Sequence, residues 1–232
     1  MPLSQSVGRC VVALALFAPA SPAWSCELPK IINATSVQEV TAFFAKQPKK
    51  VVTFLGYSGA EYEDKAAMLA RAGKVLDGYD PRQTIVNIGA TLEGIGAVYE
   101  LAKQKGFATT GIVSTQAQEA KSALAPCVDT VFFVEDASWG GLVPGTTRLA
   151  PTSQAMVQVS DEVVAIGGGE VSRDELEAAQ RMDKKWQVFP ADMNHAIARE
   201  KALKKSQPAP TDFSGAIRAG AGSGGPGKRG GD

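Results

Sequence analysis

Three consecutive glycines stand where an apolar run ends and a charged segment begins, in the sequence VVAIGGGEVSRDELEAA. The glycines are Gly167, Gly168 and Gly169, and the segment after them carries Ser172 and Glu175. This order is typical of a turn that leads from a buried strand into a helix. Glycine lets main-chain N–H groups approach a ligand closely, and the N-terminus of a helix favours anions. The pattern predicts that this turn binds the phosphate of a nucleotide-type ligand.

The same residues have a second interpretation that needs no ligand. Ser172 and Glu175 have the S-x-x-E spacing of a capping box, in which two side chains close the start of a helix. The carboxylates of Glu170, Asp174 and Glu175 also oppose a bare phosphate by Coulomb repulsion. They suit ribose hydroxyls better, and a carboxylate beside a ribose could stabilise positive charge during cleavage of a glycosidic bond. Glu175 is therefore the first candidate for a catalytic residue.

Two other glycine-containing turns follow apolar runs earlier in the chain. Gly56 and Ser58 lie in the first turn, and Gly89, Thr91 and Gly94 lie in the second. In an open parallel sheet, ligands collect beyond the carboxyl ends of the strands, where the strand order reverses. We expect both turns to lie beside the glycine triplet and to line one binding site with it.

A long loop, residues 135–152, precedes the helix that leads to the triplet. A loop of this length in a compact domain is usually functional or mobile. Trp139 could stack on a base, and Thr146 and Arg148 could contact a phosphate. Alternatively, Trp139 only holds the loop against the core. We expect this loop to determine ligand specificity.

Strand-like and helix-like segments alternate regularly through the middle of the chain. The strand-like segments are almost continuously apolar, as in KVVTFL and DTVFFV, which is typical of strands covered on both faces. Short links between strands and helices indicate parallel pairing with right-handed crossovers. Residues 49–205 are therefore predicted to form one α/β domain, doubly wound and Rossmann-like, with about six parallel strands and helices on both faces. Residues 26–48 are predicted to form an N-terminal helical extension.

The two ends of the chain differ in composition from the middle. Residues 1–25 combine one arginine, a short apolar run and small residues near Ala23, which is the pattern of a signal peptide. We expect an exported protein, periplasmic or secreted, with no membrane span after the signal is removed. Residues 206–232 are rich in Gly, Pro and Ser and are predicted to be disordered. Cys26 and Cys127 could form a disulfide in an oxidising compartment or remain two free thiols.

The composition excludes several classes of site. Lys and Arg number 24, and Asp and Glu also number 24, so the formal net charge of zero does not indicate nucleic-acid binding. His195 is the only histidine, which excludes a His-rich metal cluster and leaves one possible base for a Ser-His-Asp triad. The chain also lacks the spacing of a P-loop and of a dinucleotide-binding fingerprint. Neither a metal nor a cofactor is predicted.

The sequence DEVVAIGGGEVSRDEL resembles the signature of the lysine-decarboxylase-like proteins, whose best-known members are the LOG phosphoribohydrolases that activate cytokinins. It is similar more widely to the SLOG superfamily of Rossmann-like proteins that bind nucleotides and nucleotide sugars. The family signature reads P-G-G-x-G-T-x-x-E after a strand that opens with Asp. Here Asp161 opens the strand, Gly168 and Gly169 match the paired glycines, Ser172 stands for Thr, and Glu175 is the Glu. The upstream NIGATLEGIGAVYELA is similar to the family's G-G-x-x-G-L-M-G turn.

The resemblance covers most of residues 51–190 and implies a nucleotide-type ligand and a homodimer. Gly167 replaces the proline of the signature, and Val171 replaces its third glycine. The family's enzymes place an Arg-Lys pair on the preceding helix, and those positions hold Thr152 and Ser153 in this chain. Nucleotide binding therefore transfers to this chain more directly than hydrolysis does.

These observations predict an exported protein that binds a nucleotide or a nucleotide sugar. One alternative is a hydrolase that cleaves the N-glycosidic bond of a nucleoside monophosphate. In that case Glu175 would stabilise the cationic transition state, and Arg148 would orient the phosphate. The other alternative is an interaction module whose glycine turns are purely structural and bind no ligand.

Overall fold

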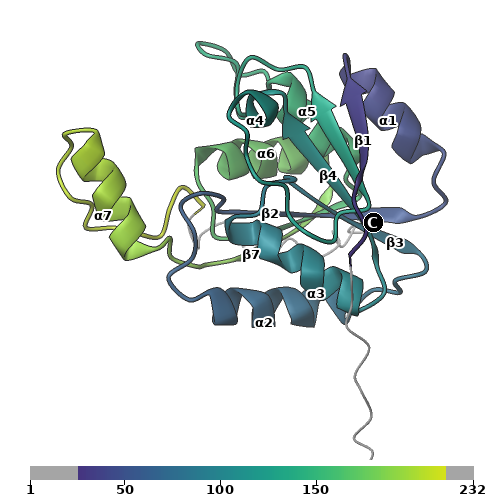
Figure 1. The fold of residues 1–232 in the computed structure, drawn as a ribbon, viewed down its shortest axis with the longest axis horizontal. Helices are drawn as coiled ribbons and strands as arrows, with labels where there is room; N and C mark the ends of the chain where they lie inside the picture. The colour runs from purple at the N-terminus through teal and green to yellow at the C-terminus, as the bar shows by residue number, and fades with distance from the viewer. Residues whose placement is uncertain (1–25, 218–232) are drawn as a thin grey trace, which may run out of the picture.

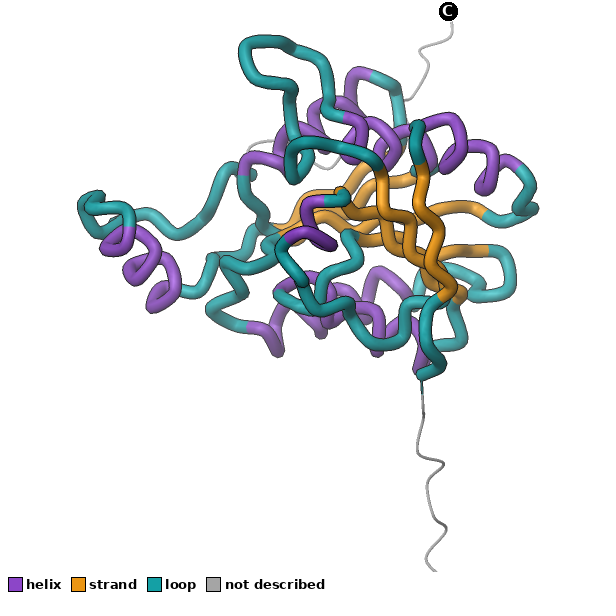
Figure 2. Tube along the Cα trace, turned by 45° about the horizontal axis from the view of Figure 1, so that its top comes forward, coloured by secondary structure: helices purple, strands orange, loops and turns teal. Residues whose placement is uncertain are grey.

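Within the described residues, seven parallel strands form one sheet with helices on both faces (Figures 1 and 2). The structure is a computed structural model, and it describes residues 26–217. The strands are β1 (Lys30–Ala34), β2 (Lys50–Gly56), β3 (Thr84–Ile88), β4 (Ala108–Ser114), β5 (Thr130–Val134), β6 (Glu162–Ile166) and β7 (Lys185–Phe189). The helices are α1 (Val37–Ala45), α2 (Lys65–Leu76), the 3-10 helix η1 (Gly94–Ala97), α3 (Val98–Gln104), α4 (Gln116–Glu119), α5 (Pro151–Val159), α6 (Glu170–Arg181) and α7 (His195–Lys204).

The order of the strands across the sheet brings the predicted turns to one place. That order is β1-β5-β4-β3-β2-β6-β7. From β2 the chain passes through β3 and β4 to β5 on one side, and it then returns to place β6 and β7 on the other side. The strand order therefore reverses beside β2, where the turns after β2, β3 and β6 share the carboxyl edge of the sheet. Ligands bind at this position in open parallel sheets.

Side chains of β2 alternate between two hydrophobic cores, one on each face of the sheet. Val52 and Phe54 belong to the core beneath α2 and α3, whereas Val51 and Leu55 belong to the core beneath α1, α5 and α6 (Figure 1). Both faces are covered, which explains why the strands are almost continuously apolar. The predicted fold class, a doubly wound α/β domain, is confirmed.

The sheet has one strand more than the sequence predicted. Strand β1 lies in the segment 26–48, which was expected to be a helical extension, and it pairs with β5 from Lys30↔Thr130 to Ala34↔Val134. The segment does contain the expected helix, α1, with Ser36 as its N-cap. The sequence did not predict this strand because it is a five-residue edge strand, KIINA, that is mostly exposed and lacks a continuous apolar run.

A disulfide joins the start of the described chain to the loop before β5. The sequence left the pairing of Cys26 and Cys127 open. In the structure the two residues form a disulfide, and their Cα atoms lie 4.8 Å apart. The bridge closes a segment that contains β1, β2, β3 and β4. It therefore ties the edge strand β1 to the body of the domain.

Residues 206–217 differ from the prediction of a disordered tail. After α7, which projects from the side of the domain in Figure 1, the chain returns to the sheet edge and buries Ile217. Composition alone predicted disorder because the segment is poor in apolar residues. In the structure, Phe213 stacks on the His195 ring and Ile217 packs into a hydrophobic core. The rest of the predicted tail, and the predicted signal peptide 1–25, lie outside the described residues. Among the helices that the structure describes, none has the length and apolar character needed to span a membrane.

Candidate functional site

The turns after β2, β3 and β6 are joined by hydrogen bonds at the carboxyl edge of the sheet, which we call the rim. The hydroxyls of Ser58 and Thr91 lie 3.1 Å apart, linking the β2 and β3 turns. The Ser172 hydroxyl donates to the Gly56 carbonyl at 2.9 Å, linking the β6 turn to β2. The sequence-predicted residues of these three turns therefore lie together, as expected.

Two of the predicted ligand glycines are required by contacts within the chain. Gly94 has a φ of +61°, and a Cβ built there would lie 2.0 Å from the Tyr57 carbonyl oxygen. A Cβ at Gly56 would lie 2.0 Å from the Tyr62 hydroxyl. These glycines let turns approach each other, so their role in the structure is independent of a ligand.

The remaining rim glycines divide into a constrained pair and an open pair. Gly167 has a φ of +55°, and its Cβ would lie 2.7 Å from Tyr57 Cε2, whereas Gly168 has a φ of +142°. By contrast, a Cβ at Gly89 or Gly169 would meet no atom within 4 Å. The last glycine of the triplet and the glycine of the β3 turn therefore face open space.

Helix α6 begins with amides that no protein group accepts. Gly169 is its N-cap and has no side-chain capping bond. Among the described residues, the N–H groups of Glu170, Val171 and Ser172 have no hydrogen-bond acceptor. Such a helix N-terminus favours an anion through its free N–H groups and its dipole.

The capping-box interpretation of Ser172 and Glu175 is wrong. The N-cap of α6 is Gly169, three residues before the predicted N-cap Ser172. Ser172 is therefore the third residue of the helix, and its hydroxyl donates to the Gly56 carbonyl of β2. Glu175 lies one turn further along and makes its hydrogen bond to Ser153 of α5. The two side chains at this spacing thus bond α6 to two neighbouring elements, β2 and α5.

One of the three carboxylates near the start of this helix is paired with a cation. The Asp174 carboxylate lies 2.8 Å from Arg173 and accepts a hydrogen bond from the Leu142 amide at 3.2 Å. Among the three carboxylates of the turn, Glu170 is the exposed one. The Coulomb repulsion expected against a phosphate is therefore smaller than the sequence suggests.

Glu175 is buried between α6 and α5. It is 5% exposed, and it accepts a hydrogen bond of 2.6 Å from the Ser153 hydroxyl, which in turn accepts one of 2.7 Å from the Gly141 amide. Burial raises the pKa of Glu175 to about 7; the Ser153 hydrogen bond lowers it and Asp174 raises it further. The carboxyl group is therefore directed at α5 and is partly protonated at neutral pH.

The long loop is more ordered than the sequence indicated. Buried Asp136 anchors its start by accepting hydrogen bonds from the Thr152 amide and from Ser138. Further along, Leu142 and Leu149 form an antiparallel bridge, so the loop is a small hairpin. The loop contacts the first turn of α6 through glycines 140 and 141.

The predicted ligand residues of the loop are exposed. Thr146 and Arg148 lie on the exposed tip of the hairpin, and the Thr146 hydroxyl donates to the Val143 carbonyl. Within residues 26–217, no hydrogen bond or ion pair joins Arg148 to Glu175. Trp139 is 52% exposed, so it is not packed fully against the core.

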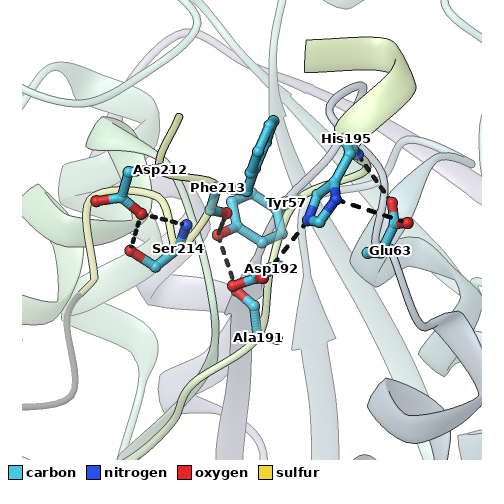
Figure 3. Close-up of polar contacts among 8 residues, drawn as sticks. All are labelled: Tyr57, Glu63, Ala191, Asp192, His195, Asp212, Phe213 and Ser214. Atoms are coloured by element: carbon cyan, nitrogen blue, oxygen red, sulfur yellow. Dashed lines mark hydrogen bonds and ion pairs between the residues drawn. The ribbon is translucent and has the colours of Figure 1, made fainter. Parts of the chain in front are cut away.

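The sequence did not identify Tyr57 as a residue that connects separate turns of the site. Tyr57 is buried and its hydroxyl donates to the Ala191 carbonyl at 2.9 Å, reaching from β2 to the turn after β7 (Figure 3). Burial raises the pKa of Tyr57, and the Gly168 amide acts in the opposite direction. Its place directly after Gly56 was the available signal, but the sequence does not show where a buried ring points.

Two solved structures are similar to this chain at low sequence identity. Neither the models of known protein families nor the curated proteins gave a match. The solved structure of the Moco carrier protein from Chlamydomonas reinhardtii is 15% identical with a TM-score of 0.44, over 68% of this chain and 85% of that one. The molybdenum cofactor binding protein from the phototrophic bacterium Rippkaea orientalis is 16% identical with a TM-score of 0.44, over 60% of this chain and 76% of that one. The chain has the Rossmann-like fold predicted from its sequence, and these two proteins are similar to it.

Proposed function

We propose that this chain is an exported protein that binds a nucleotide or a nucleotide sugar at the rim, with the phosphate on the first turn of α6. The observation that carries the proposal is the uncapped N-terminus of α6 beside open space at Gly169. The hydroxyls of Ser58 and Thr91 lie on the neighbouring turns and can contact the sugar. Arg173 compensates the nearest buried carboxylate, Asp174.

Plain binding is favoured over cleavage of the glycosidic bond. A catalytic Glu175 would have to present an ionised carboxylate to the ribose, but here the group is buried, bonded to Ser153 and has a raised pKa. The residue that would orient the phosphate, Arg148, lies on an exposed hairpin tip. These features favour plain binding over hydrolysis by this route.

Export is supported by the disulfide, because such bonds persist in oxidising compartments and are rare in the cytoplasm. The resemblance found in the sequence also implies a homodimer, which we retain as part of the proposal.

The decisive experiment is a panel of nucleotides and nucleotide sugars tested by thermal shift and titration calorimetry. A ligand at a hundred times its dissociation constant should stabilise the native state by about 2.7 kcal/mol. Chromatography of the same mixtures should detect no free base. If no member of the panel stabilises the protein, binding of this ligand class is excluded; release of free base would establish the hydrolase.

A pair of variants locates the site. Gly169→Asp places a carboxylate at the N-cap, where Asp is a preferred residue, so it should occupy the free amides of α6 itself. We expect unchanged or slightly raised stability together with loss of nucleotide binding. Gly169→Ala, whose Cβ meets open space, is the matched control and should leave the fold intact without supplying a carboxylate. Arg148→Ala should bind the nucleotide as tightly as the wild type does. A loss of binding in this variant would place the phosphate site at the hairpin instead.

A further inference from the structure

A short C-terminal segment lies against the glycine triplet. Residues 212–217, which we call the strap, follow α7 and bond to the turns after β6 and β7. Figure 3 shows the first three residues of the strap, Asp212, Phe213 and Ser214. The Met193 amide, in the turn after β7, donates to the Phe213 carbonyl at 2.9 Å. The Tyr57 hydroxyl lies 3.5 Å from the same carbonyl oxygen. The strap is thus held by turns that follow two different strands.

Side chains hold both ends of the strap. The Phe213 ring stacks on the His195 ring with centroids 3.9 Å apart, and the Arg199 guanidinium lies 5.1 Å from the Phe213 ring centroid. His195 is itself placed between Glu63 and Asp192 (Figure 3). At the other end, Ile217 is 4% exposed and belongs to the hydrophobic core on the α6 side of the sheet.

Between these two anchors, the strap binds the carbonyl group of Gly168. The amide of Ala216 donates to this oxygen at 2.9 Å and the amide of Ile217 at 3.4 Å. The described residues contain no cis peptide bond. In a trans peptide the C=O and the following N–H point in opposite directions. The strap therefore fixes the Gly169 N–H so that it points away from the strap.

We propose that the strap is a positioning segment for the ligand site: it holds the Gly168–Gly169 peptide in one orientation, in which the Gly169 N–H joins the free amides of the first turn of α6. Like those amides, the Gly169 N–H has no acceptor among the described residues. Glycine adopts many backbone conformations at low cost, and Gly168 has a φ of +142°, so this peptide needs an external partner to keep one orientation. Docking of the strap and binding of the ligand are then coupled. This inference rests on the nucleotide site proposed above.

The test removes one strap N–H. Ala216→Pro eliminates the donor to the Gly168 carbonyl, because proline has no N–H. Ala209→Pro is the matched control, because Ala209 is exposed in the same C-terminal segment and makes no hydrogen bond within the described residues. Phe213→Ala releases the strap in a second way, and Phe213→Tyr, which keeps the ring, should restore docking.

Two measurements are made on each full-length variant. Residual dipolar couplings report the orientation of the Gly169 N–H without any ligand. Titration calorimetry with AMP and with inorganic phosphate reports affinity. We expect Ala216→Pro and Phe213→Ala to change the Gly169 coupling and to weaken AMP binding about fivefold, the effect of about one hydrogen bond. Ala209→Pro should change neither quantity.

The outcomes separate this inference from the proposed function. An unchanged Gly169 coupling in Ala216→Pro and Phe213→Ala overturns the strap as a positioning segment, whatever the protein binds. Equal or tighter AMP binding by these variants also overturns it, and tighter binding would make the strap a blocking segment. If wild-type protein binds neither AMP nor phosphate while the coupling changes as expected, the strap orients the turn but the proposed ligand class is wrong.

Discussion

The Ser153 hydroxyl donates a hydrogen bond of 2.6 Å to the buried carboxyl group of Glu175. Ser153 occupies a position at which the resembling enzymes carry one residue of an Arg-Lys pair. A hydroxyl in this place satisfies one oxygen of Glu175 but provides no positive charge to keep the group ionised. Burial therefore dominates, and the pKa of Glu175 rises to about 7.

This burial makes stability depend on pH. The pKa of Glu175 is near 4.5 in the unfolded chain and about 7 in the native state, so between these values the native state binds a proton that the unfolded state has lost. The free energy of unfolding should therefore fall as pH rises through this window, by on the order of 3 kcal/mol. Glu175→Gln should remove this dependence and be more stable than wild type at pH 8. Urea unfolding at pH 5 and pH 8 measures the free energy of unfolding of both proteins. Glu177→Gln, at an exposed site on α6, is the control. A Glu175→Gln variant that keeps the wild-type pH profile would contradict the assignment.

The glycines of the rim should differ sharply in their tolerance of a methyl group. Gly94→Ala forces a Cβ to 2.0 Å from the Tyr57 carbonyl in a left-handed backbone, and we expect a loss of more than about 2 kcal/mol. Gly89→Ala meets open space and should change stability by less than about 0.5 kcal/mol. Chemical denaturation of the two variants provides the comparison. Similar losses in both would show that the turns after β2 and β3 do not meet as described.

The disulfide should contribute strongly to stability, because it closes a long loop. Cys26 and Cys127 are separated by 101 positions, for which restriction of the unfolded chain predicts about 4–5 kcal/mol. Cys127→Ser should lose this amount, and so should Cys26→Ser. The double variant should be no less stable than either single one, because all three lack the same bond. Additive losses would instead mean that each cysteine contributes by packing alone.

The sequence predicted the fold class and the meeting of three turns because both depend on short-range patterns and on general rules for parallel sheets. The hydroxyl contact between Ser58 and Thr91 is the direct outcome of that rule. The start of α6 was misjudged because S-x-x-E spacing also occurs inside a helix, where the two side chains can bond to other elements. Spacing alone does not distinguish these cases.

The long loop and the C-terminal segment were predicted less well for a different reason. Thr146 and Arg148 have side chains suited to phosphate, but a two-residue bridge between Leu142 and Leu149 decides where they lie. Phe213 and Ile217 are isolated apolar residues in a polar segment, and their order comes from partners far away in the chain. Such long-range contacts leave no local periodic signal.

The Tyr57 hydroxyl connects three parts of the chain that meet only after the sheet is assembled. Its neighbours Ala191 and Phe213 are 134 and 156 positions away in sequence, and they reach it only when β6 has paired with β2 and β7 with β6. The contacts of Tyr57 with Ala191 and Phe213 therefore depend on the pairing of β2, β6 and β7. In this arrangement the shape of the glycine turn depends on strands from both halves of the described chain.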